Sequence, residues 1–393
     1  MLWPAKRHAD SSPDSPCMQQ QPRISSIDAV RALALLGILL VHSHDHFNIY
    51  FHTLPECALD TITNWIYKNV LLAKAFLVFS FLFGLSFALQ MDRAAVRGVD
   101  FRLRFCWRLV LLAVFGLIHS FFYCGDILLI FAVTGFVPVL VWKVRTRYIA
   151  IAAALCFLQP FALYNYAVGQ PEVLYDWYGD VCRAMGMPGA PASATASFAE
   201  MGMWNVTCGV VHSFLYMVYT YRVWALLGFF LTGIVAGRLR LFESKPHRLL
   251  IIGACGAGAY VVALCFLHLW AEPHGMQTVS RMWVNESFVF MVVPLLAWVL
   301  TRASMQWLST ALQPIGRCTL TCYIMQSVVM LWIICGYGLA WGPHLSTSAY
   351  MGLGALLYLL QLGFCHLWLR RFKYGPLEGI WRKLTRMGMP TCQ

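Results

Sequence analysis

The chain carries ionisable side chains inside segments that are otherwise apolar, and the first of these segments is the most informative. Six of its residues follow one another by three or four positions: Asp28, Arg31, Leu35, Ile38, His42 and Asp45. In a helix these residues share one face. A buried histidine that titrates near neutral pH suits proton transfer, and His42 would lie about 16 Å along the helix axis from Arg31. The alternatives are a histidine bonded to a neighbouring helix, and an Asp28–Arg31 salt bridge that secures the start of the helix.

Four more ionisable residues are predicted to lie at the depth of His42. His119 stands near the outer end of its apolar segment, and Asp126 follows it after a tight turn. Lys74 and Arg222 enter two other segments from the same side. Ionisable groups inside a membrane are costly and are functional candidates by default. Two cations, a carboxylate and two imidazoles predict a site for a polar or anionic ligand; mutual ion pairs between helices are the alternative.

A band of uncharged polar residues, 319–327, belongs to a later segment. Such residues often bind membrane helices together, and a pore lining is the alternative. From this band we assign Tyr323 and Gln326, together with Asp28, as candidates for substrate contact. No Cys or His spacing is typical of a zinc site, so no metal is predicted. A disulfide is left open among three cysteines on or near the predicted outer side: Cys57, Cys124 and Cys182.

Membrane helices must position these side chains. The 393 residues are 60% hydrophobic and only 12% charged, whereas a soluble domain is about a quarter charged. A spanning helix needs roughly 20 mainly apolar residues. Ten segments meet or nearly meet this length, starting near Ile27, Val70, Phe105, Ile127, Tyr148, Gly209, Leu249, Ser287, Thr319 and Ala349. The pair of segments around His119 and Asp126 could instead form one re-entrant element, because only residues 123–125 separate them. The sequence predicts an all-α, polytopic membrane helix bundle.

The positive charges predict the orientation of the bundle. With the N-terminus inside, most of the 29 Lys and Arg residues fall in cytoplasmic segments, as the positive-inside rule requires. The exceptions are five: Lys68, Lys74, Arg183, Arg222 and Arg281. Both termini are therefore predicted to be cytoplasmic, in a protein of the inner (cytoplasmic) membrane. The net charge of +12 is explained by topology, so we predict no nucleic-acid partner.

The chain divides into three parts. Residues 1–22 are polar and rich in Ser, Pro and Gln, which predicts a disordered cytoplasmic N-terminus. Residues 23–369 form the transmembrane bundle, with a long outer loop near 169–206 that is read as a spacer rather than a lid. Residues 370–393 form a basic, aromatic cytoplasmic segment. We interpret it as an anchor on the inner leaflet and assign it no chemistry.

Several motifs resemble a known family. Residues 23–38 are similar to the N-terminal signature of the YeiB-like bacterial membrane proteins (domain of unknown function 418). Further stretches are similar to other motifs of that family: 79–84, 116–119 with 125–128, 316–327 and 374–382. That family has no settled activity, so the resemblance implies a fold more than a function. Two positions depart from the family pattern, Ala32 in place of Gly and His42 in place of Asn.

The eleven-residue step from Arg31 to His42 resembles the first helix of the acyltransferase-3 type of membrane acyltransferases, which modify surface sugars. This resemblance implies an acyl-CoA donor that enters from the inner side near Arg31. His42 would then act as general base on a small-molecule or saccharide acceptor outside. Arg31 would steady the phosphates, and His119 and Asp126 would orient the acceptor or the base.

Two other functions stay open. A transporter or exporter of a small polar or anionic solute would bind its substrate at the polar level and couple it to protonation of His42. The sequence has no pair of short, Gly- or Pro-broken helices in matching halves, which many transporters have. A non-enzymatic partner of an envelope complex is the third option. The sequence does not predict the oligomeric state.

Overall fold

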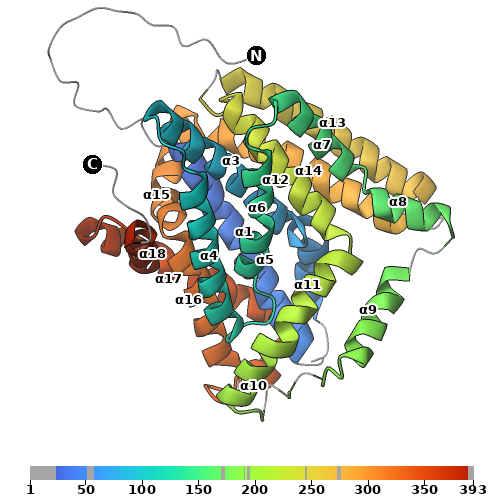
Figure 1. Cartoon of the computed structure of the whole chain (residues 1–393). Coiled ribbons are helices and arrows are strands. Elements are labelled where there is room, and N and C mark those ends of the chain that lie inside the picture. The colour runs from blue at the N-terminus through green and yellow to red at the C-terminus, as the bar shows by residue number, and fades with distance from the viewer. Residues whose placement is uncertain are drawn as a thin grey trace, which may run out of the picture.

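The computed structural model describes residues 24–50, 57–169, 173–189, 191–192, 195–243, 246–271 and 276–387. Over these residues the regular secondary structure is helical throughout and contains no strand (Figure 1). The predicted all-α fold is therefore confirmed. The predicted disordered segment 1–22 lies outside the described residues.

Among the residues that the structure describes, seven helices are long and apolar enough to span a membrane, and up to nine are if each of two bent pairs counts as one span. Four of the seven are Ser25–Asp45 of α1 (Ser25–Tyr50), α4 (Arg102–Ser120), α14 (Gln277–Leu300) and α17 (Thr347–Arg371). The other three are composite: Ala58–Val96 consists of α2 (Ala58–Ile66), η1 (Tyr67–Leu71) and α3 (Lys74–Val96), Thr146–Ala167 of α7 (Thr146–Phe157) and α8 (Pro160–Ala167), and Pro246–Ala271 of α13 (Pro246–Phe266) and η3 (Leu267–Ala271). The bent pairs are Phe198–Tyr219 with α12 (Arg222–Arg238), and Ala303–Arg317 with α16 (Thr319–Ile334). The chain is thus a multi-pass membrane protein, and the count of ten spans stays a prediction.

The segment predicted to begin near Ile127 is the shortest of the ten. It consists of two short helices, α5 (Leu128–Thr134) and α6 (Phe136–Val141), packed beside α4. Together they form an apolar element below the length of a full span. Both termini on the cytoplasmic side also stay a prediction. We call inner the end of the bundle where Arg31 and the last helix lie, and outer the opposite end.

Helix α1 occupies the middle of the bundle (Figure 1) and packs against α3, α14, α15 (Gln306–Arg317), α16 and α17. Small residues let its neighbours approach closely. A Cβ added at Gly316 of α15 would stand 2.0 Å from the backbone oxygen of Asp28. The same device brings α3 and α12 together, where a Cβ at Gly84 would stand 2.0 Å from the Phe230 oxygen. These contacts fix the polar face of α1 toward the bundle interior.

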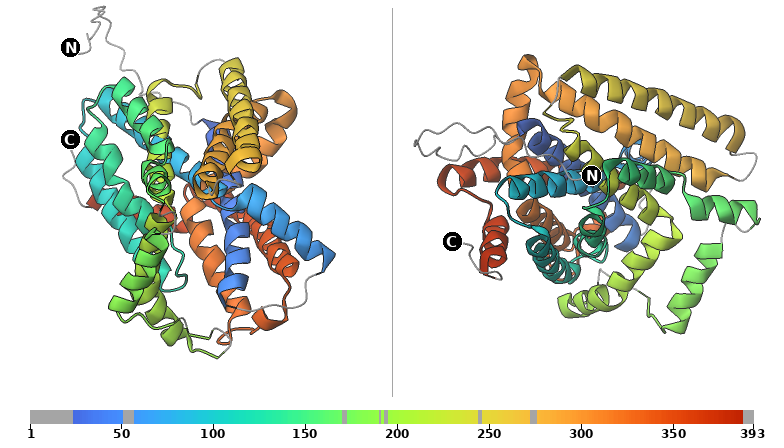
Figure 2. Two further views of the ribbon diagram at one scale, coloured as in Figure 1. Left: turned by 90° about the vertical axis from the view of Figure 1, so that its right-hand side faces the viewer. Right: turned by 45° about the horizontal axis from the view of Figure 1, so that its top comes forward.

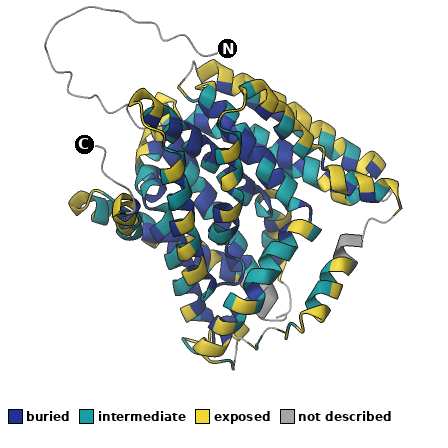
Figure 3. Cartoon of the chain, in the orientation of Figure 1, coloured by how far each residue is buried: buried dark blue, intermediate teal, exposed yellow. Residues whose placement is uncertain are grey.

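The outward faces of the peripheral helices are apolar. On α13 and α17 the exposed residues include Ile251, Val261, Val262, Leu359 and Leu360. In Figure 3, where the ribbon is coloured by burial, the exposed residues lie on the outside of the bundle and the buried residues lie within it. Helices α13 and α14 lie side by side at one edge, as two views show (Figures 1 and 2). Apolar outward faces of this kind fit a lipid environment.

The predicted outer loop near 169–206 contains helices. They are α9 (Val173–Ala184) and α10 (Phe198–Trp204), which continues through η2 (Asn205–Gly209) into α11 (Val210–Tyr219). Helix α9 lies at the periphery (Figure 1) and packs on α11. The ring of Tyr178 contacts the rings of His212 and Tyr219 on α11. The described part of this segment thus contains helices, and its role as a spacer stays a prediction.

Candidate functional site

Two cavities meet inside the bundle. The inner cavity encloses about 290 Å³ and the outer cavity about 360 Å³. Both are lined by Ile38 of α1 and by Ile127, which precedes α5. The face of α1 predicted from the sequence therefore runs along both cavities, with Arg31 in the inner one and His42 in the outer one.

Much of the lining of the inner cavity is apolar. Aromatic and aliphatic side chains from α3, α4 and α5 line it: Phe79, Leu82, Phe83, Leu109, Leu112, Leu128 and Phe131. Tyr323 of α16 also lines this cavity. Ligand sites in proteins are typically apolar with a few polar groups that set the orientation, and this cavity has that composition.

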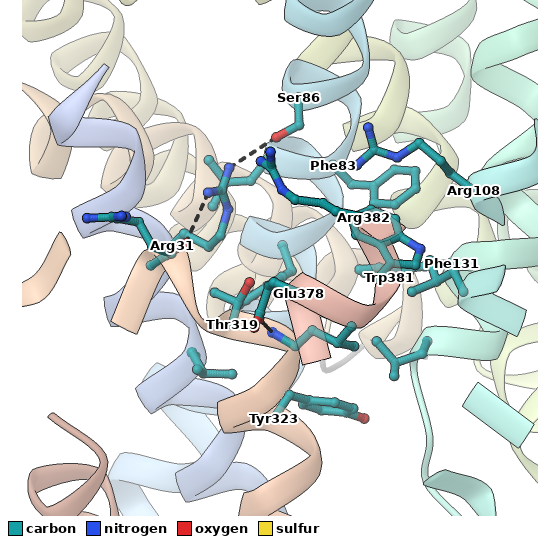
Figure 4. A pocket seen from close by; sticks show the side chains of 18 of the residues that line it. Arg31, Phe83, Ser86, Arg108, Phe131, Thr319, Tyr323, Glu378, Trp381 and Arg382 are labelled. Atoms are coloured by element: carbon teal, nitrogen blue, oxygen red, sulfur yellow. Dashed lines mark hydrogen bonds between the residues drawn. The ribbon is translucent and has the colours of Figure 1, made fainter. Parts of the chain in front are cut away.

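Cationic side chains gather at the inner cavity, as Figure 4 shows for three of them. The lining includes Arg31, Arg108, Arg317, Lys373 and Arg382. Arg31 donates to the Asp28 carboxylate at 2.7 Å and to the Ser86 hydroxyl at 3.1 Å. The predicted Asp28–Arg31 pair is thus present. It holds the guanidinium at the cavity, so the salt bridge and a binding role for Arg31 are compatible.

The other four cations have no carboxylate within 4.0 Å among the described residues. Arg108 donates to the side-chain oxygen of Gln90 and stacks on the Trp381 ring at 4.1 Å from its centroid. Its Nε is buried without a hydrogen-bond partner in the described structure. A cavity with uncompensated positive charge attracts an anionic ligand.

The last helix, α18 (Pro376–Met387), forms one wall of the inner cavity. The Glu378 carboxylate accepts hydrogen bonds from the backbone nitrogens of Leu320 and Thr321, at 2.7 and 3.1 Å, and from the Thr321 hydroxyl at 2.6 Å. It therefore caps the first turn of α16, where the helix dipole favours a negative charge. Trp107 of α4 donates to the backbone oxygen of Leu384.

The interpretation of residues 370–393 as an anchor without chemistry missed this wall. Lys373, Tyr374, Glu378, Trp381 and Arg382 all line the inner cavity. The available signal was a single acidic residue, Glu378, within a strongly basic amphipathic segment. Such a residue is out of place on an anionic membrane surface, and it points to a specific partner inside the protein.

The outer cavity is lined mainly by apolar and aromatic side chains, with a few polar and charged groups among them. Its lining includes His42, Asp45, Tyr67, Tyr123, Trp204, His212, Tyr216 and Arg222. The Tyr67 hydroxyl donates to Asp45 at 2.6 Å, and the Arg222 guanidinium lies 4.7 Å from the Tyr216 ring centroid. Flat aromatic faces beside a carboxylate and a guanidinium suit a polar ligand that offers hydroxyl groups.

Four rings contact one another, and we call them the ring cluster: His42, Tyr123, Tyr323 and His119. His42 and Tyr123 line the outer cavity and Tyr323 lines the inner one. The His42 ring lies 4.5 Å from the Tyr123 ring and 5.8 Å from the Tyr323 ring. The His119 ring lies 4.7 Å from the Tyr323 ring and 6.3 Å from the Tyr123 ring. The two tyrosines therefore each contact both histidines.

Asp126 fixes the far side of the ring cluster. Its carboxylate lies 2.7 Å from Nδ1 of His119 and accepts the Tyr323 hydroxyl at 3.3 Å. The other oxygen accepts the backbone N–H of Leu129. Nε2 of His119 is buried and has no hydrogen-bond partner among the described residues. A carboxylate at one ring nitrogen sets the tautomer and orientation of the imidazole.

The predicted site is therefore assembled in part. His42, His119, Asp126 and Tyr323 come together, and Arg222 lines the outer cavity. Two predicted members lie elsewhere. The Lys74 ammonium is 5.5 Å from the Phe288 ring and lines neither cavity. The Gln326 amide donates to Gln361 at 2.8 Å between α16 and α17, and it lines neither cavity. Its assignment to substrate contact stays a prediction.

The predicted outer cysteines are not bridged. Cys57, Cys124 and Cys182 are free thiols. Within the described ranges, no group of three or more His, Cys, Asp and Glu side chains is placed to hold a metal ion.

Comparison with known proteins agrees with the resemblance expected from the motifs. A sequence model for the family described as "Protein of unknown function (DUF418)" matches residues 236–388. The chain is 27% identical to the uncharacterised protein YxaH of Bacillus subtilis (strain 168), over 92% of this chain and 94% of that protein. It is 26% identical to the uncharacterised protein YeiB of Escherichia coli (strain K12), over 92% of this chain and 95% of that protein. The chain is thus similar over most of its length to YxaH and YeiB, and its C-terminal part matches the DUF418 family model.

Proposed function

We propose that this protein is an acyltransferase of the inner (cytoplasmic) membrane, which moves an acyl group from a cytoplasmic donor to an extracytoplasmic acceptor. One observation carries the proposal: a cationic inner cavity and an aromatic outer cavity share the lining residues Ile38 and Ile127, and the ring cluster contributes Tyr323 to the first cavity and His42 to the second. A transfer across a membrane needs two binding sites of different chemistry and a base at their junction. His42 lines the outer cavity within ring contact of Tyr323, which lines the inner one.

The inner cavity fits the donor. The phosphates of an acyl-CoA would lie among Arg31, Arg108 and Arg382, since guanidinium groups bind phosphate through charge-assisted hydrogen bonds. The linear arm would pass the apolar side chains toward Tyr323. Arg31 and His42 are about 16 Å apart along α1, a length that an extended pantetheine arm covers.

The outer cavity fits an acceptor that carries a hydroxyl group. In the proposed reaction His42 takes the hydroxyl proton, and the oxygen attacks the thioester carbonyl carbon. The carbon–sulfur bond breaks, and the thiolate leaves and is protonated by the His42 imidazolium. The products are an ester and free CoA. Tyr323, His119 and Asp126 are positioning residues in this proposal, because they hold the face against which His42 lies.

Donor binding and transfer are tested on purified protein. Wild-type protein is expected to bind acetyl-CoA in calorimetry, and Arg31→Gln and Arg108→Gln each to bind about tenfold to a hundredfold more weakly, because each removes a charge-assisted contact. The matched control is Arg238→Gln on α12, an arginine that stacks on Trp142 outside both cavities. Equal affinity in all three variants contradicts the donor site.

Transfer is followed as label passing from radioactive acetyl-CoA to an envelope fraction. His42→Gln is expected to lower the rate by about a hundredfold to ten-thousandfold, the usual contribution of a general base, while donor binding is retained. His366→Gln is the control, because His366 bonds to the Ala311 oxygen and lines neither cavity. A His42→Gln protein that transfers at the wild-type rate refutes the mechanism.

A transporter of a small polar or anionic solute is the second candidate, and one observation favours it. Two pairs of helices that would cross the membrane are bent by 81° and 75°, at the α11–α12 and α15–α16 breaks. Broken helices form the substrate sites of many transporters. Solute uptake by proteoliposomes without any acyl donor would favour transport, and its absence together with label transfer would favour the enzyme.

A further inference from the structure

Helix α18 lines a second cavity, separate from the site described above. This cavity, which we call the α18 groove, encloses about 280 Å³ and is lined by Tyr374, Gly379, Arg382, Lys383, Arg386 and Met387. It shares Tyr374 and Arg382 with the inner cavity. A ligand in the groove would therefore contact two residues of the wall that closes the inner cavity.

The charge of the α18 groove is positive. Its three cations, Arg382, Lys383 and Arg386, are exposed, and none has a carboxylate within 4.0 Å among the described residues. The Arg382 guanidinium stacks on the Tyr374 ring at 4.1 Å from its centroid. No acidic residue lines the groove. The ligand that such a groove recognises carries negative charge.

The same helix also exposes apolar side chains. Ile380 is 50% exposed, Leu384 36% and Met387 73%. Their spacing of four and three residues places them on one face of the helix. An apolar stripe next to basic residues is the composition of a helix that lies in the interface of a bilayer. A water-soluble anion would leave this stripe exposed to water, whereas a phospholipid covers it with its acyl chains.

The position of α18 in the chain supports a lipid as the occupant. Helix α17 is long and apolar enough to span the membrane, and it ends at Arg371, five residues before α18 begins. The chain therefore passes from a span directly into α18, which keeps that helix within reach of the headgroup region. Anionic headgroups attract basic segments that adjoin a membrane span.

We propose that the α18 groove binds the headgroup of an anionic phospholipid, with Ile380, Leu384 and Met387 against its acyl chains. The phosphate lies among Arg382, Lys383 and Arg386. Because Arg382 and Tyr374 also line the inner cavity, the bound lipid holds that wall in place. This site shares Arg382 and Tyr374 with the inner cavity, but lipid binding needs neither His42 nor a bound donor.

The test uses full-length protein in a neutral detergent and short-chain phosphatidylglycerol as the probe, with short-chain phosphatidylcholine for comparison. Wild-type protein is expected to bind the anionic lipid more tightly than the zwitterionic one. The double variant Lys383→Gln/Arg386→Gln is expected to weaken phosphatidylglycerol binding by about 30-fold, since each basic residue near a headgroup contributes about a fivefold factor. The matched control is Lys143→Gln/Arg145→Gln, two exposed cations between α6 and α7, which is expected to bind as wild type.

A second pair of measurements separates a lipid from a soluble anion. Ile380→Ser/Met387→Ser is expected to weaken phosphatidylglycerol binding and to leave binding of glycerol phosphate unchanged, because both residues are exposed and touch only the chains. The proposal is overturned if glycerol phosphate binds as tightly as phosphatidylglycerol. It is also overturned if either double variant on α18 binds phosphatidylglycerol as wild type does, or if the Lys143/Arg145 control loses as much affinity as the Lys383/Arg386 variant.

Discussion

Removal of the Glu378 carboxylate is expected to detach α18 from the bundle without unfolding it. The carboxylate accepts three hydrogen bonds from the first turn of α16. A hydrogen bond to a charged group contributes about 1.5–3 kcal/mol, but Glu378 is partly exposed, so solvent reduces this figure. For Glu378→Ala we expect a loss of about 2 kcal/mol in the free energy of local opening, which corresponds to about a 30-fold increase in the open fraction.

Amide hydrogen exchange measured by mass spectrometry tests this expectation. Peptides that contain residues 319–322 and 376–387 should exchange about 30-fold faster in Glu378→Ala, because exchange follows the open fraction. Peptides of α13 should be unchanged. Glu200→Ala is the control, since Glu200 caps the N-terminus of α10 through Ser197 and lies apart from both cavities. Unchanged exchange in the peptides that contain residues 319–322 and 376–387, or an equal increase along the whole chain, would refute the inference that Glu378 holds α18 against α16.

Two further substitutions test the packing and the ring cluster. Gly84→Ala would place a methyl group 2.0 Å from the backbone oxygen of Phe230 and is expected to destabilise the α3–α12 contact by about 2–3 kcal/mol, which would lower the melting temperature in detergent. The control is Gly352→Ala on α17, where a Cβ meets nothing within 4 Å, and it should be neutral or slightly stabilising. Equal changes in melting temperature for the two variants would contradict the packing argument. Tyr323→Phe removes the hydroxyl that bonds to Asp126 and is expected to destabilise the protein by about 1–2 kcal/mol, with the affinity for the acyl donor unchanged. A melting temperature equal to that of wild type would show that this hydrogen bond contributes nothing to the stability of the protein.

The depth of the polar residues could be predicted from the sequence. The boundaries of an apolar segment tell how far along the helix a residue lies. His119 stands near the end of its segment and Asp126 just after the next turn. The sequence therefore predicts that both lie beside the outer part of α1. Their convergence with His42 at the ring cluster agrees with that prediction.

The rotation of each helix about its axis could not be predicted in the same way. A helix that is apolar all round has no face that the sequence marks as inward, because lipid is as apolar as the protein core. The sequence therefore could not predict that the Lys74 side chain lies beside the Phe288 ring and not at the cavities. In the same way, Gln326 donates a hydrogen bond to Gln361, while Tyr323, three residues earlier, lines the inner cavity.

The sequence by itself determined that this chain is an all-helical membrane protein, and that one face of its first helix carries Arg31 and His42 at opposite depths. The periodicity of polar residues and the length of apolar segments depend only on the local sequence, so both can be read without a structure. Only the tertiary structure decided that α18 folds back to form a wall of a cationic cavity, and that this cavity shares Ile38 and Ile127 with a second cavity that His42 lines. Those arrangements depend on contacts between residues far apart in the chain, such as Glu378 with Thr321, and no local pattern encodes them.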